Sequence, residues 1–174
     1  MPPYVARTDY TAPYRLGNPP MPIVTMDELR DSLPTGAILM GLDVGTKTIG
    51  VAVSDAGWAF AHPRPVIRRT KFGADWKALE AMIESEAAAA LVVGLPLHLD
   101  GRLSPRGQAA RAFAANVLAR RDLPIAMWDE RLSTVAAERA MIDADVSRAK
   151  RAARIDSAAA AFILQGALDR LVAD

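Results

Sequence analysis

The sequence predicts an α/β fold, with a mixed sheet of five strands (three antiparallel, then two parallel) and helices on both faces. After residue 37 come three β-rich segments separated only by short turns, and such neighbours usually pair antiparallel. Two short apolar segments follow, each reached through a helical segment, and helical crossovers join parallel strands. A long alanine-rich segment with helical periodicity then ends the chain.

The three antiparallel strands are expected over residues 38–43, 48–54 and 58–69. The first two are apolar and flank a glycine-containing turn. The third contains Pro63 and Pro65, which have no N–H to donate to a neighbouring strand. We therefore expect the third strand at an edge of the sheet.

Helices and buried strands are expected to alternate in the rest of the chain. Apolar residues recur at helical spacing over 74–87, 134–142 and 154–172. Short apolar runs at 90–95 and 125–128 are typical of parallel strands that are buried on both faces.

One further helix is predicted between these two strands. Ser104 and Pro105 have the residue types preferred for a helix N-cap and first helical position. The residues that follow form an apolar stripe at helical spacing: Ala110, Phe113, Ala114, Val117 and Leu118.

The first 36 residues do not follow this pattern. Seven of the twelve prolines lie within the first 34 residues, so residues 1–22 are predicted to form an extended or disordered arm. A short helix should follow, with Thr25 as its N-cap and Glu28 three residues later. We therefore divide the chain into a proline-rich arm with a short helix, 1–36, and a main domain, 37–174.

Composition narrows the classes of protein. The chain has no cysteine, which excludes disulfides and thiolate sites and is typical of a reducing compartment, so a cytoplasmic location is expected. No apolar run approaches the roughly 20 residues that span a bilayer, so no membrane partner is expected. The net charge of +1 neither favours nor excludes nucleic acid, and no pattern predicts an oligomeric state.

Carboxylates at three places in the chain are candidate metal ligands. Asp43 ends the first strand, Asp129 and Glu130 follow the last one, and Asp156 lies on the apolar stripe of the C-terminal helix. Alone, each has a plainer role in a turn, on the surface or at a helix start. In such sheets, however, sites form outside the carboxyl ends of the strands, where one acid from each element can converge.

Converging carboxylates repel one another unless a cation lies between them. Oxygen ligands without cysteine favour Mg²⁺ or Mn²⁺, and such ions serve the hydrolysis of phosphodiesters.

Four motifs, in order along the chain, resemble one known family: GLDVGTKTIGVAVSD, VVGLPLHLDGRLSP, WDERLST and KRAARIDSAAAAFIL. They resemble the Holliday-junction-resolvase-like family of pre-16S rRNA nucleases (YqgF/RuvX-like). The resemblance implies an RNase H-like fold and a metal-dependent endonuclease acting on structured RNA or DNA. The role it favours is maturation of the 5′ end of pre-16S rRNA, with branched DNA as the other substrate.

The resemblance also implies roles for residues. The catalytic, metal-binding acids would be Asp43, Glu130 and Asp156, while Asp129 and Asp100 are weaker candidates for a fourth acid. Substrate contacts are expected in the turn after the first acid, after the second acid, and in the basic segment before the third: Gly45, Thr46, Lys47, Arg131, Ser133, Thr134, Lys150, Arg151 and Arg154.

Three alternatives stay open. The chain could be a Holliday-junction resolvase acting on DNA, or a protein that holds RNA or a transcription complex without cutting. The Asp-x-Gly-Thr turn also resembles the phosphate loop of the actin, hexokinase and Hsp70 superfamily, but that fold needs two such domains to close over a nucleotide. Metal-dependent cleavage that is lost in Asp43→Asn separates a nuclease from a binding protein.

Overall fold

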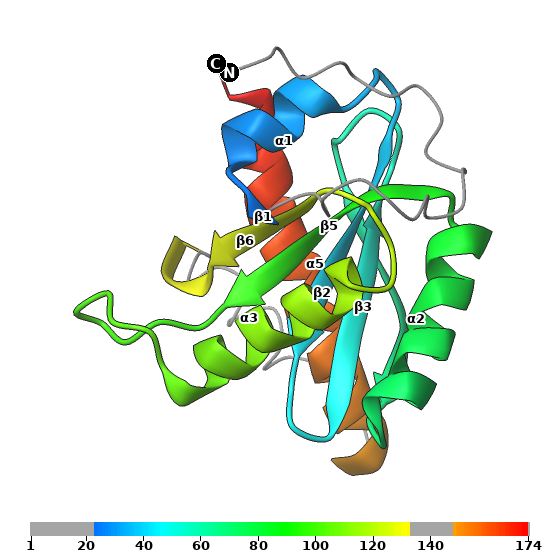
Figure 1. Ribbon diagram of the computed structural model, residues 1–174, viewed down its shortest axis with the longest axis vertical. Coiled ribbons are helices and arrows are strands. Elements are labelled where there is room, and N and C mark those ends of the chain that lie inside the picture. The colour runs from blue at the N-terminus through cyan, green and yellow to red at the C-terminus, as the bar shows by residue number, and fades with distance from the viewer. Residues whose placement is uncertain (1–22, 133–147, 174) are drawn as a thin grey trace.

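A computed structural model of the 174-residue chain describes residues 23–132 and 148–173, and within 148–156 only the backbone. The described residues form three layers, with α2 and α3 on one face of a sheet and α5 and α1 on the other (Figure 1). The elements are β1 (Ile23–Val24), α1 (Met26–Ser32), β2 (Ile38–Val44), β3 (Thr48–Ser54), β4 (Ala61–Arg68), α2 (Phe72–Ser85), β5 (Ala88–Leu95), α3 (Pro105–Leu118), β6 (Ile125–Asp129), the 3₁₀ turn η1 (Glu130–Leu132) and α5 (Arg148–Val172).

The sheet confirms the predicted α/β class. Its strand order is β1-β6-β5-β2-β3-β4, in which β2, β3 and β4 pair antiparallel and β2, β5, β6 and β1 pair parallel. The proline-containing β4 lies at one edge, as expected.

The sheet has six described strands, whereas five were predicted. The additional strand is β1, which pairs with β6 through Ile23 and Ile125. Two residues are too few to show a strand's alternating pattern in the sequence. The start of β4 is also corrected from 58 to Ala61, because Asp55 and Phe60 close a turn in which Trp58 has a φ of 55°.

The predicted short helix is α1, and it begins with the expected capping box. The Thr25 side chain accepts from the Glu28 N–H, and the Glu28 carboxylate accepts from the Thr25 N–H at 2.7 Å. Leu29 is fully buried in the cluster that α5 forms with the sheet, so α1 packs on the same face of the sheet as α5. Residues 1–22 and the helix expected over 134–142 lie outside the described residues, and the division into arm and main domain stays a prediction.

Side chains alternate between the two faces of the central strands, and this alternation fixes which face each acid occupies. On β2, Met40 and Leu42 belong to the core under α2 and α3, while Leu39 belongs to the core under α5. Asp43 therefore points to the α5 face.

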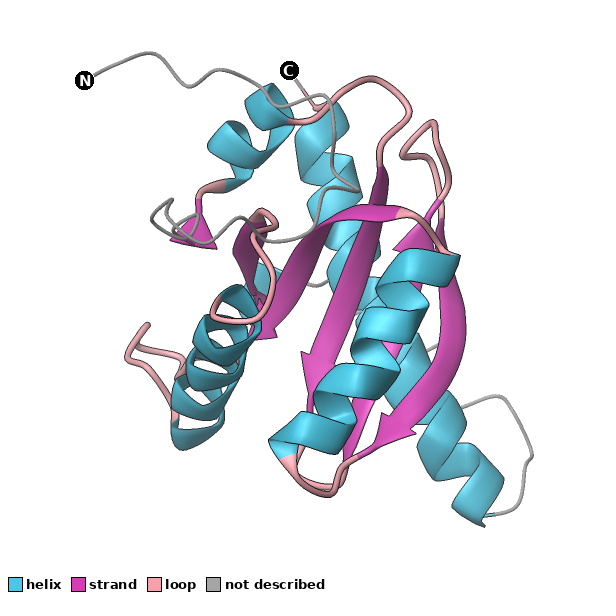
Figure 2. Cartoon of the chain, turned by 45° about the vertical axis from the view of Figure 1, so that its right-hand side comes forward, coloured by secondary structure: helices cyan, strands magenta, loops and turns pink. Residues whose placement is uncertain are grey.

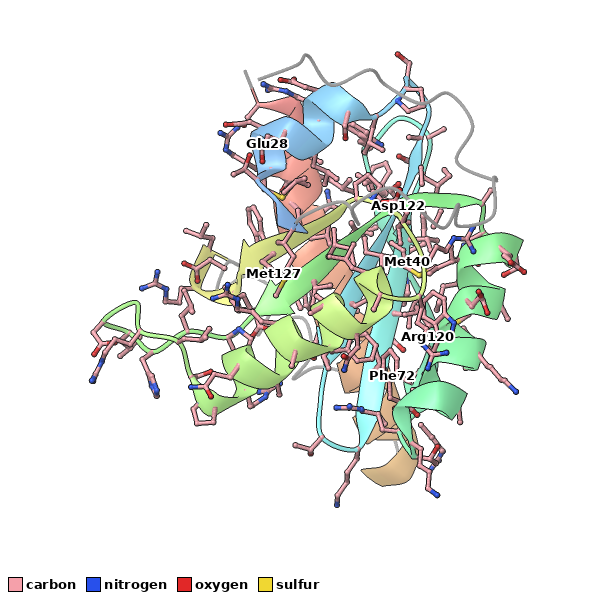
Figure 3. All side chains as sticks on the ribbon, viewed as in Figure 1. Glu28, Met40, Phe72, Arg120, Asp122 and Met127 are labelled. Atoms are coloured by element: carbon pink, nitrogen blue, oxygen red, sulfur yellow. The ribbon has the colours of Figure 1, made fainter. Side chains whose placement is uncertain are left out.

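On the opposite face, α2 and α3 contact each other through aromatic side chains. The Phe72 and Phe113 rings meet edge to face. The guanidinium of Arg120 lies over the Phe72 ring (Figure 3).

Helix α5 crosses the back of the sheet in both ribbon views, and its N-terminal turns lie at the end where β2 turns into β3 (Figures 1 and 2). It begins six residues before the expected position 154. Within the described parts of the chain, no helix combines the length and the apolarity that a membrane span requires.

Candidate active site

Asp43 lies near the carboxyl end of β2, where it pairs with Gly50 of β3. Its side chain is 16% exposed, and Arg106 Nη2, from the first turn of α3, lies 3.6 Å from its Oδ1. The arginine side chain is more than half exposed. The first predicted acid is therefore partly buried and has a cationic neighbour that can also reach solvent.

Glu130 directly follows β6 and opens the 3₁₀ turn η1. Its Oε1 is buried and has no hydrogen-bond partner among the described residues. The neighbouring strand makes room for the carboxylate at Gly94, where a Cβ would lie 2.6 Å from Glu130 Oε1 and 2.5 Å from Ile163 Cδ1 of α5. The carboxylate therefore lies over Gly94, on the same face of the sheet as Asp43.

The surroundings of Glu130 disfavour its charge. Burial raises the pKa of Glu130, the negative charges of Asp43 and Asp129 raise it further, and the Arg106 guanidinium opposes the shift. An unpartnered buried carboxylate oxygen beside a second acid is costly unless a cation is bound there. The oxygen donors of Asp43 and Glu130 fit a hard divalent ion such as Mg²⁺.

Asp129 is held in a different way. Its carboxylate accepts hydrogen bonds from Arg131 Nη2 at 2.6 Å and from Arg131 Nε at 3.0 Å, and Arg131 holds the pKa of Asp129 below its usual range. Asp100, the other suggested fourth acid, is paired with Arg102 at 2.6 Å. These pairs support the choice of Glu130 as ligand, which stays a prediction.

Asp156 is placed by its backbone alone. The hydroxyl of the next residue, Ser157, donates to the Arg64 carbonyl of β4. In the sheet, Arg64 pairs with Val51 of β3, and Val51 pairs with Leu42 of β2, which directly precedes Asp43. The third acid is therefore level with the first along the sheet. The described residues contain no group of three metal-ligating side chains, and the Asp156 side chain lies outside them.

The turn beside Asp43 is fixed by an arginine that the sequence analysis did not select. Arg69 Nη1 donates to the Gly45 carbonyl at 2.7 Å, and the Arg69 N–H donates to the Lys47 carbonyl at 2.9 Å. The guanidinium also pairs at 3.5 Å with Asp75, which is only 2% exposed. Arg69 therefore joins the turn that holds Gly45, Thr46 and Lys47 to the start of α2.

We expect Arg69→Met to lower the free energy of unfolding by about 1–3 kcal/mol, because it leaves the buried Asp75 carboxylate without its cation. Urea denaturation measures this change. Arg30→Met is the matched control, since Arg30 also lies 3.5 Å from its partner Asp31, but that carboxylate is 74% exposed. The control should change the stability by less than about 0.5 kcal/mol. Equal effects of the two substitutions would contradict a structural role for the buried pair.

The other predicted substrate residues are described only in part. Arg131 is described, and its guanidinium donates hydrogen bonds to the Asp129 carboxylate and to the Leu99 carbonyl. Ser133 and Thr134 lie outside the described residues, as do the side chains of three basic residues on the first turns of α5: Lys150, Arg151 and Arg154. No place beside Asp43 or Glu130 was predicted for Arg106 and Gly94, because only the folded sheet brings them to the two acids.

Comparison with known proteins identifies the family. Residues 37–170 match the family described as RuvX, Holliday junction resolvase. A protein of Rhizobium meliloti (strain 1021) is 61% identical over 87% of this chain and 92% of its own length, and one of Sphingopyxis alaskensis is 64% identical over 80% and 91%. Both carry the name "Putative pre-16S rRNA nuclease".

Among solved structures, Thermus thermophilus RuvC in complex with a Holliday junction substrate aligns at a TM-score of 0.48 and 13% identity, over 73% of this chain and 91% of that one. The mixed α/β sheet expected from the sequence is confirmed by the observed strand order and pairing. The chain belongs to the RuvX family of Holliday junction resolvases.

Proposed function

We propose that this protein is a metal-dependent endonuclease that hydrolyses phosphodiester bonds in structured RNA, and that its substrate is the 5′ end of pre-16S rRNA. The observation that carries the proposal is the buried, unpartnered Oε1 of the Glu130 carboxylate beside Asp43 at the carboxyl end of the sheet. The name shared by the relatives supports the choice of substrate. A cytoplasmic location is part of this proposal.

Asp43 and Glu130, joined by Asp156 from α5, would hold Mg²⁺ or Mn²⁺. When bound, such an ion lowers the pKa of a water molecule and stabilises negative charge on phosphate oxygens. The protein's own groups prepare the site for this. Gly94 and Ile163 of α5 lie around the buried Glu130 Oε1, and the Arg69 guanidinium fixes the turn next to Asp43.

Arg106 has a suitable place for binding the substrate backbone. Its guanidinium lies beside Asp43 and is largely exposed, so it can pair with a phosphate whose ester bond lies at the two acids. Lys47, in the turn held by Arg69, adds a second cation at the same end of the sheet.

The proposal is tested with a labelled RNA that spans the mature 5′ end of 16S rRNA. We expect the wild type to cut it in Mg²⁺ and not in EDTA, and Asp43→Asn to lose the activity. Asp31→Asn, a change at an exposed carboxylate, should cut like the wild type. A four-way DNA junction is assayed in parallel. If only the DNA junction is cut, the proposed RNA substrate is wrong and the protein is a DNA junction resolvase. If RNA is bound but not cut, the non-catalytic binding protein is favoured.

The basic segment before Asp156 gives a separate prediction. We expect replacement of both Lys150 and Arg151 by alanine to weaken RNA binding and to reduce the slope of log affinity against log salt by somewhat over one unit, since each lost phosphate contact removes about 0.7–0.9. Binding measured from low to moderate salt gives the slope. Replacing both Arg120 and Arg121, which follow the C-terminus of α3, is the matched control and should leave the slope unchanged. An unchanged slope in the Lys150 and Arg151 variant would mean that these residues only solvate the surface.

A further inference from the structure

A short hairpin projects from the sheet between the end of β5 and the start of α3 (Figure 1). Leu97 and Leu103 form an antiparallel bridge at its base. The His98 N–H donates to the Arg102 carbonyl at 2.9 Å, and the Gly101 N–H donates to the His98 carbonyl at 2.8 Å. Gly101 has a φ of 84°, so the loop is a three-residue hairpin turn that ends in a left-handed glycine. This geometry gives the tip one defined backbone conformation.

The tip of the hairpin is tied to the candidate active site. Arg131 Nη1 donates to the Leu99 carbonyl at 3.3 Å, while Nη2 of the same side chain donates to Asp129 at 2.6 Å. Arg131 directly follows Glu130, so a single side chain connects the tip to the chain segment that carries the second acid. The hairpin tip is therefore held at a fixed place relative to the segment that carries Glu130.

Leu99 stands at the first central position of this turn and is 96% exposed, more than any other large apolar side chain among the described residues. Single exposed apolar residues are common and usually need no explanation. The Leu99 side chain, however, extends into solvent from a turn with a defined backbone conformation, and polar residues are preferred in such turns. Two arginines with largely exposed side chains lie in the same stretch of chain, Arg102 in the hairpin and Arg106 in the first turn of α3.

We propose that Leu99 is a positioning residue that packs against an unpaired base of an RNA strand bound at Asp43 and Glu130. This inference rests on the proposed function and names the feature of the RNA that the site selects. The exposed arginine side chains suit a polyanion, and the exposed apolar side chain at the tip of the hairpin suits the face of a base. A base that is already unpaired meets Leu99 without the cost of opening a duplex.

The test compares two RNA probes, both bound in Ca²⁺: a fluorescently labelled hairpin with a single-stranded 5′ extension, and the same RNA with its extension paired to a complementary strand. Leu99→Ala should weaken binding of the first probe about fivefold, the loss expected when roughly half of a leucine's burial is removed, and should leave the second unchanged. Leu99→Phe should restore or strengthen binding, because an aromatic ring stacks on bases. The salt slope should not change, since an apolar contact releases no counterions.

Phe60→Ala is the matched control. Phe60 is also a large exposed apolar residue in a turn, but that turn joins β3 to β4 at the end of the sheet opposite Asp43. It should bind both probes like the wild type, and neither Leu99→Ala nor Phe60→Ala should change the Tm.

Three results would overturn the inference: unchanged binding in Leu99→Ala, equal weakening for both probes, or a wild type that binds neither probe. Its failure is distinct from failure of the proposed function. A wild type that binds the extended probe through Leu99 but leaves RNA uncut in Mg²⁺ contradicts the nuclease and upholds the contact. Cleavage that does not depend on Leu99 upholds the nuclease and contradicts the contact.

Discussion

Glu130→Gln should lower metal-dependent cleavage by more than about a hundredfold, while raising the Tm of the metal-free protein. Loss of activity is expected because the amide cannot supply the negative charge that a divalent ion needs. Partners of metal ligands alone already contribute about 10- to 100-fold, and a ligand should contribute more. Turnover of the RNA substrate at saturating Mg²⁺ measures this loss. Asp129→Asn is the matched control and should stay active, since its partner is Arg131.

The gain in stability follows from the direction of the pKa shift. Burial raises the pKa of Glu130 in the folded protein, so ionisation of the carboxyl opposes folding. This cost is absent below the ordinary carboxyl pKa and is complete once the pH exceeds the raised value. The Tm advantage of the glutamine variant should therefore be present at neutral pH, about 2–4 °C for each 1 kcal/mol removed, and should vanish in acid. A glutamine variant less stable than the wild type in EDTA at neutral pH would contradict this account of Glu130.

Gly41→Ala should lower the free energy of unfolding by about 2–3 kcal/mol and should also lower cleavage. The added Cβ would lie 2.6 Å from Leu164 Cβ and 3.0 Å from the Ala160 carbonyl, so α5 must move away from β2. Asp156 lies one turn before Ala160 on that helix, and displacing the helix displaces the third acid. Thermal denaturation and cleavage are measured on the same preparation.

Gly73→Ala is the control for this substitution. Gly73 lies in the first turn of α2, and a Cβ there meets nothing within 4 Å. Alanine favours helix over glycine, so the control should be neutral or slightly stabilising. A Gly41→Ala protein as stable and as active as the wild type would show that α5 need not stay in contact with β2.

The elements that could be predicted from the sequence are those that carry their own local signal. The N-cap and first residue of α3, Ser104 and Pro105, follow rules of helix capping that need no tertiary contact. Pro63 and Pro65 placed β4 at an edge because a missing N–H cannot pair on both sides. Strand β1 could not be predicted, because two residues show no periodicity and pair with β6 only after the chain has folded back.

The candidate site divides in the same way. Adjacent residues of a strand face opposite sides, so the sequence predicted that only one of Asp129 and Glu130 could join Asp43. It could not predict the space above Gly94, which depends on the register between β5 and β6. The role of Arg69 could not be predicted for a related reason. With Arg68 and Lys71 it forms a short run of basic residues, and such runs usually lie on a solvated face. The buried Asp75 carboxylate that pairs with Arg69 is recognisable only in the fold.

The central claim is that Asp43 and Glu130 share a divalent cation. The most direct measurement is the anomalous diffraction of Mn²⁺ in crystals of the wild-type protein. We expect a peak within about 2.1–2.2 Å of one carboxylate oxygen from each of Asp43 and Glu130, with Asp156 from α5 as a third ligand. Ordered density for both carboxylates with no peak between them at millimolar Mn²⁺, or a peak held by Asp129 in place of Glu130, would contradict the claim.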